Sequence, residues 1–177
     1  GKLIRYRVAF FAMRGAIQGV TDSIEGFREL QFKLAELEKV INRNTDSIKA
    51  YKDASLRFAK DFGESILKVV EIMKIWAQTG LQQNEVLEAT KSTLIGVTAL
   101  GLTTSETTEA LTAAIFTYGV AVEDVTVIIS KWLAVQKNFP ISAKDLANSL
   151  KVVGAAAQVV GVDLNDLAGY VAAIGSA

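Results

Sequence analysis

Two residue types that carry much of enzyme chemistry are missing here: the 177 residues include no cysteine and no histidine. Without cysteine there is no disulfide framework, thiol nucleophile or thiolate metal site. Without histidine the commonest catalytic base near neutral pH and the commonest metal ligand are absent. Proline occurs once, and no uninterrupted apolar run approaches the roughly 18 residues of a membrane span. The composition predicts a folded chain that is not an ordinary enzyme.

Carboxylates offer one remaining route to hydrolysis, because glycosidases use two acids and need no histidine. Acidic pairs occur at Glu106/Glu109, Glu123/Asp124 and Asp163/Asp166. All of them fall in the first turns of expected helices, where the helix dipole and free N–H groups favour carboxylates without any catalysis. No nucleophile, nucleotide or metal motif accompanies them. We therefore expect no enzymatic activity, cofactor or metal site, with a peptidoglycan hydrolase as the alternative.

Charge is divided unevenly, although the totals balance at 19 basic and 19 acidic residues. Residues 1–60 hold 12 Lys/Arg against 7 Asp/Glu, and residues 61–177 hold 7 against 12. Four basic side chains and no acid occur in the first twenty residues. This pattern is typical of a solvated basic helix end or of a contact with an acidic surface. No aromatic stacking pattern accompanies it, so sequence-specific nucleic-acid binding is not expected.

Residues 3–52 have the pattern of one long amphipathic helix. Apolar side chains recur in steps of three and four, with Asn44 in the one polar slot, which is the heptad spacing of a coiled-coil seam. The seam consists of Phe10, Met13, Ile17, Val20, Ile24, Phe27, Leu30, Leu34, Leu37, Ile41 and Ile48. Such a helix would be about 75 Å long. Its narrow stripe predicts partner helices from other copies; the alternative is packing on the C-terminal part of the same chain.

From residue 53 onward the sequence changes to short helices separated by turn signals. The expected helix ends are Gly80, Gly101, Gly119 and Gly161, each followed by an apolar residue, with Pro140 at the remaining junction. Capping residues open the next helices: Thr103 and Thr104 before Glu106, Ser142 before Asp145, and Asp163 before Asp166. The helices expected are 54–62, 65–79, 82–100, 104–118, 122–138, 143–159 and 164–174.

The fold class predicted from these patterns is all-α. A long coiled-coil helix forms domain 1–52, and a compact bundle of short helices with Gly-capped turns forms domain 53–177. The junctions lie about 21 residues apart, in the range of helical-hairpin arrays, but the residue identities repeat too weakly for a named solenoid. Trp76, Phe116, Trp132 and Leu133 are the expected core residues.

Five short segments carry a family resemblance. They are Ala54–Gly63, Ala77–Leu81, Gly119–Glu123, Ile141–Leu150, and Val153–Ala157 followed by Gly161 and Val162. In this order they resemble the conserved domain of phage tail tape measure proteins, also called tail-length or minor tail proteins, over residues 50–177. Pro140 departs from the small polar residues usual in the family. The sequence also stops where that domain normally carries on, so we expect an excerpt of a longer chain.

The resemblance implies a virion protein of the bacteriophage tail, made in the host cytoplasm and held in the lumen of the tail tube. It would set tail length during tail assembly and leave ahead of the DNA during genome ejection. The implied partners are other copies of the chain in a trimer or hexamer, tail tube and tail tip or baseplate hub proteins, and the host membrane on ejection. No catalytic residue transfers from the family. The alternative is a membrane-active helical effector acting on the host envelope.

Overall fold

A computed structural model describes residues 25–41 and 45–175, and these residues contain helices and turns but no strand. Residues 25–38 form the first described helix. The others are α2 (Thr45–Phe62), α3 (Ile66–Gln78), α4 (Gln83–Leu100), α5 (Thr104–Thr112) with a π-helical turn (Ala113–Thr117), a 3-10 turn (Val122–Asp124), α6 (Val125–Asn138), α7 (Ala143–Val159) and α8 (Leu164–Gly175). The all-α prediction is confirmed.

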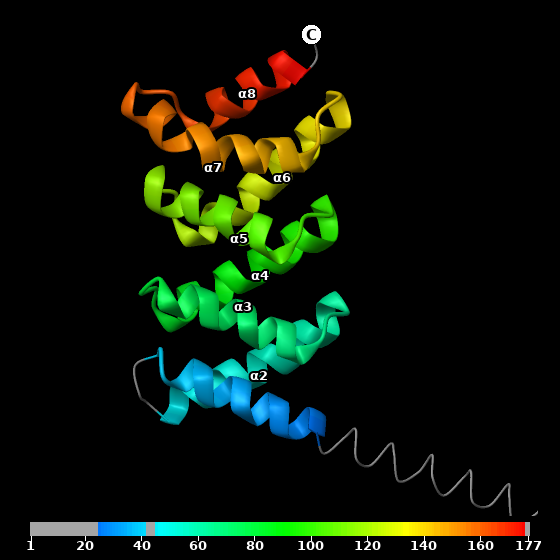
Figure 1. Cartoon of the computed structure of the whole chain (residues 1–177), viewed down its shortest axis with the longest axis vertical. Coiled ribbons are helices and arrows are strands. Elements are labelled where there is room, and N and C mark those ends of the chain that lie inside the picture. The colour runs from blue at the N-terminus through cyan, green and yellow to red at the C-terminus, as the bar shows by residue number, and fades with distance from the viewer. Residues whose placement is uncertain (1–24, 42–44, 176–177) are drawn as a thin grey trace, which may run out of the picture.

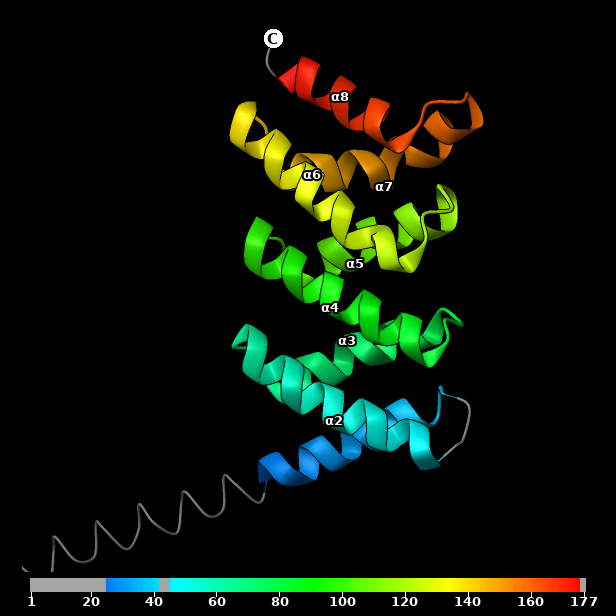
Figure 2. The ribbon, with the colours of Figure 1, turned by 180° about the vertical axis from the view of Figure 1, so that it is seen from behind.

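The helices stack into an elongated array of two layers, with short turns between successive helices (Figures 1 and 2). In one layer α2 packs on α4 and α4 on α6, while α5 packs on α7 in the other. The extensive contacts of each helix are thus with helices one or two places along the chain. The prediction of a compact bundle is wrong. The helices are of similar length and their junctions recur about every 21 residues, so each helix packs only against its near neighbours and the helices form a stack.

Local signals place the helix ends where the sequence predicts them. Gly80, Gly101, Gly119 and Gly161 have φ angles of +84°, +67°, +65° and +82°, the left-handed conformation that ends a helix and that favours glycine. Gly63, with φ +67°, does the same after α2 and was not predicted. Before Pro140 the backbone of Phe139 is extended, because the proline ring disfavours a helical residue at that position.

Side-chain caps open the helices as expected. The Thr103 backbone N–H donates to Glu106 Oε2 (2.9 Å), and the Glu106 N–H donates back to Thr103 Oγ1 (3.2 Å). Ser142 and Asp145 exchange the same pair of bonds, at 2.9 and 3.2 Å. Asp163 accepts the backbone N–H groups of the second and third residues after it. The capping prediction is therefore confirmed at all three helix starts.

The long N-terminal helix is interrupted, which corrects the prediction of one helix over residues 3–52. The helix of residues 25–38 ends in a turn at 39–41, where the N–H groups of Val40 and Ile41 both donate to the Leu37 carbonyl. A new helix, α2, then begins at Thr45. The reversal buries Leu37 and Tyr51 (0 % and 2 % exposed) within the chain itself, and burial of this apolar surface favours a turn over continued helix. The 52/53 domain boundary falls inside α2.

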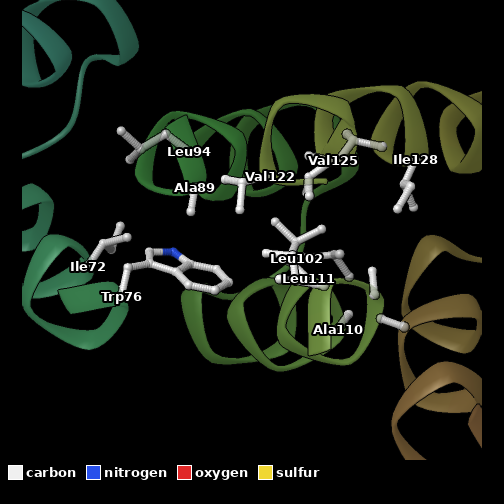
Figure 3. Close-up of a cluster of buried hydrophobic side chains, with 14 of the residues drawn as sticks. Ile72, Trp76, Ala89, Leu94, Leu102, Ala110, Leu111, Val122, Val125 and Ile128 are labelled. Carbon is white, nitrogen blue, oxygen red and sulfur yellow. The ribbon is translucent and has the colours of Figure 1, made fainter. Parts of the chain in front are cut away.

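The core runs through the array between the two layers. Trp76 is fully buried, and its indole N–H donates to Thr93 Oγ1 at 2.9 Å. Figure 3 shows its ring below Ala89 and pointing toward Leu102 and Leu111. This confirms Trp76 as a core residue, as burial does for Trp132, and Leu133 packs partly buried against the same core.

The prediction that Phe116 belongs to the core is wrong, since its side chain is 53 % exposed. The inward positions of this helical stretch are taken by Ala110, Leu111, Ala114 and Ile115. Two residues on from Ala114, Phe116 lies about half a helical turn away from that face. The large apolar side chain of Phe116 favoured burial in the prediction, but its position on the helix faces outward, and the smaller Ala110 and Ala114 face the core.

Candidate interaction surfaces

The predicted seam divides into two parts. Leu37 is fully buried, and Leu30, Leu34, Ile41 and Ile48 pack partly buried against the core of their own chain. For these residues the intramolecular alternative holds, which corrects the expectation that other copies cover them. The sequence did not separate the two cases because an apolar stripe has the same spacing whichever chain covers it.

Phe27 is the one other seam residue that the structure describes. Phe27 is 59 % exposed. The remaining seam residues lie outside the residues that the structure describes: Phe10, Met13, Ile17, Val20 and Ile24. A seam role between copies therefore stays a prediction for Phe27 and for these five residues.

Ion pairs connect neighbouring helices in the layer that contains residues 25–38, α3, α5 and α7. Glu106 of α5 pairs with Lys144 of α7 (2.7 Å), and further along the same two helices Glu109 pairs with Lys151. At the other end of the array Glu36 pairs with Lys74 of α3 at 3.0 Å. These pairs join helices two places apart in the chain, so they help to fix the register in which this layer stacks.

The same contacts determine what the predicted acidic pairs do. The Lys144 ammonium and the Thr103 cap lower the pKa of Glu106 to about 2, and Lys151 and Ser105 lower the pKa of Glu109. A general acid needs the opposite shift, a pKa raised toward neutrality. Asp163 holds the start of α8 through two backbone bonds. Within the described residues these carboxylates thus serve as caps and ion-pair partners.

The lowered pKa of Glu106 gives a pH prediction. A carboxyl whose pKa falls on folding stabilises the protein above its ordinary pKa of 4.5, and this contribution is lost as the pH falls toward about 2. We expect the free energy of unfolding, measured in urea, to decline across this window, and to decline less steeply in Glu106→Gln. Lys144→Gln should flatten the profile similarly, because it removes the main cause of the shift. An unchanged slope in both variants would contradict this assignment.

The described residues contain no group of three or more acidic side chains that could hold a metal ion. None of their helices combines the length and the apolar character needed to cross a bilayer.

The comparison with known families decides the class of this protein. Residues 52–177, more than two thirds of the chain, match the family described as Phage-related minor tail protein. The chain belongs to that family. No solved structure matches it. The matched range agrees closely with the range of 50–177 over which the five segments showed their resemblance.

Family membership makes this chain a component of the bacteriophage tail, and so of the virion, where it associates with other tail components. The matched range comprises nearly all of the two-layer array, from the middle of α2 to α8. The two-layer array is therefore the part of this tail protein that carries the family match.

Proposed function

We propose that this tail protein is a structural tape measure component in the lumen of the tail tube, which sets tail length during assembly and leaves ahead of the DNA. The match to a minor tail protein family over residues 52–177 carries the proposal. The chemistry supports it, because Glu106, Glu109 and Asp163, weighed as part of a catalytic alternative, serve as caps and ion-pair partners. We infer that the protein acts by assembly and performs no reaction.

Within such a protein the array suits an anchoring role better than the ruler itself. As one continuous helix, 177 residues would span about 265 Å, at 1.5 Å per residue. The glycine turns fold the described chain back on itself instead (Figure 1). In a folded array, added residues form additional helices that fold back on the earlier ones. The length of the array then does not grow by 1.5 Å for each added residue. It is better suited to hold tail tube and tail tip or baseplate hub proteins at one end of a tail.

We further propose that copies of the chain associate through the seam residues from Phe10 to Phe27 in a trimer or hexamer. The full chain should then sediment at three or six times its mass of 19.0 kDa. Ile24→Lys should reduce this to the single-chain mass, because it places an unpaired charge in an apolar contact. Val127→Lys is the matched control, since Val127 is a half-exposed α6 residue outside the seam. Equal masses for wild type and Ile24→Lys would contradict the seam.

Tail length supplies the functional test of the same variants. In the phage that carries this protein, Ile24→Lys should abolish tails of uniform length, as measured by electron microscopy, while Val127→Lys should leave the length distribution unchanged. Uniform tails of normal length built with a dissociated Ile24→Lys protein would refute the proposal that the associated chain sets their length.

A further inference from the structure

The packing of the array is uneven between α3 and α5. Among helices two places apart, α2 packs extensively on α4, α4 on α6 and α5 on α7, whereas α3 and α5 do not pack extensively on each other. Between them lies a groove of about 440 Å³, lined by side chains of both helices, including Ile75 of α3 and Ser105 of α5. The contact between α6 and α8 is also sparse, but there Lys131 donates a hydrogen bond to Asn165 Oδ1 at 2.8 Å.

Polar contacts do not bridge this groove, which we call the α3–α5 groove. The ion pairs described above join residues 25–38 to α3 and α5 to α7. Lys68 and Glu71 of α3 line the groove but pair on their own side of it, Lys68 with Glu64 (2.6 Å) and Glu71 with Lys33 (3.7 Å). Among the described residues no hydrogen bond or ion pair joins α3 to α5. The layer is therefore held together on either side of the groove and not across it.

One helix, α4, packs extensively on both sides of the groove. It contacts α2 and α3 on one side and α5 and α6 on the other. Its contact with α5 is close at Gly96, where a Cβ would lie 2.5 Å from Thr107 Cγ2. Hinges between packed elements are formed by a few residues, often small ones. α4 around Gly96 is thus placed to act as a pivot beside an open groove.

One large buried side chain extends from α3 toward α5. Figure 3 shows the ring of Trp76 of α3 pointing toward Leu102 and Leu111. The side chain is fully buried, and its indole N–H donates to Thr93 Oγ1 of α4. Trp76 therefore provides apolar contact between the two sides where their helices pack least.

We propose that the array bends at the α3–α5 groove, with α4 around Gly96 as the pivot and Trp76 as the contact that limits the bend. Residues 25–38, α2 and α3 then tilt as one block against the block of α5 to α8, and each block keeps its internal packing. Regions joined by few contacts open at a lower free-energy cost than densely packed ones. A tail protein with such a hinge changes the angle between its two ends without unfolding. The bending does not depend on the proposed function, so the two can fail separately.

Distances between pairs of spin labels, measured by pulsed electron paramagnetic resonance, test the hinge. The chain has no natural cysteine, so labels attach only to introduced ones. Glu71→Cys with Ser105→Cys places a label on each side of the groove. The matched controls are Asp53→Cys with Glu71→Cys in one block and Ser105→Cys with Asn148→Cys in the other, and all of these side chains are exposed. We expect a broader distance distribution across the groove, extending to longer distances, than in either control.

Trp76→Ala should broaden the distribution across the groove further and leave both controls unchanged, because it removes the contact that limits the bend. Trp76→Phe should have a smaller effect in the same direction, and it replaces the alanine variant if circular dichroism shows that the latter does not fold. A distribution across the groove that is no broader than the two controls when Trp76 is retained would overturn the hinge. Equal broadening of all three pairs in the Trp76 variants would overturn it as well, since the array would then loosen throughout.

Discussion

Replacing Trp76 with alanine is expected to lower the free energy of unfolding by about 3–5 kcal/mol, the usual cost of removing a fully buried tryptophan. The side chain has no exposed surface, and its ring points toward Leu102 and Leu111 across the junction of α3, α4 and α5 (Figure 3). Leu102 lies in the turn between α4 and α5 and Leu111 lies in α5, so collapse of the cavity would require several elements to move. The stability of the array depends on this site because each helix packs extensively only against helices one or two places along the chain.

Urea unfolding followed by circular dichroism measures this cost, and Trp76→Phe is the matched control. Phenylalanine keeps most of the apolar volume but loses the N–H that donates to Thr93 Oγ1. The hydroxyl of Thr93 still donates to the Ala89 carbonyl at 2.8 Å. We therefore expect a loss of only about 1–2 kcal/mol. A cost below about 1 kcal/mol for Trp76→Ala would mean that the layers do not pack around this residue.

Two glycines in helices should respond in opposite directions to alanine. A Cβ at Gly96 of α4 would lie 2.5 Å from Thr107 Cγ2 of α5, too close for real contacts. A Cβ at Gly169 of α8 would meet no atom within 4 Å. Gly169→Ala should stabilise the protein by up to about 1 kcal/mol through helix propensity. Gly96→Ala should instead destabilise it by about 1–3 kcal/mol, because α4 and α5 must separate.

A second substitution tests the cause of that loss. Thr107→Ser removes the methyl group that would clash and keeps the hydroxyl that donates to the Thr103 carbonyl at 2.9 Å. Combining it with Gly96→Ala should recover most of the stability, which a double-mutant cycle in urea measures as a favourable coupling. Additive losses would show that the two helices do not approach as closely as the structure places them.

The sequence predicts the short helices well because local groups determine where each begins and ends. The expected ranges 143–159 and 164–174 compare with Ala143–Val159 and Leu164–Gly175 in the structure. A capping side chain, Ser142 or Asp163, opens each of these two helices, and Gly161 with its positive φ follows the first of them. Both kinds of signal act within a few residues. Such signals can be read from the sequence without knowledge of the tertiary fold.

Features that depend on distant residues could not be read in this way. The turn at 39–41 interrupts a regular heptad stripe because Leu37 and Tyr51 gain burial by folding back. The polar residues Asn42, Asn44 and Asp46, which favour turns and helix starts, were the available signal. The elongated shape likewise follows from which helices cover one another, and periodicity within a helix does not encode that choice.

The location of the protein in the tail can be tested with a single introduced cysteine, because the natural sequence has none. Phe116→Cys places it at a side chain that is 53 % exposed and lies outside the seam. The reagent is a maleimide carried on a polymer too large to enter a tail tube. The isolated chain should react with it rapidly. In intact virions the cysteine should be protected, and it should become reactive when genome ejection is triggered. Reaction in intact virions at the rate of the isolated chain would contradict a place inside the tube.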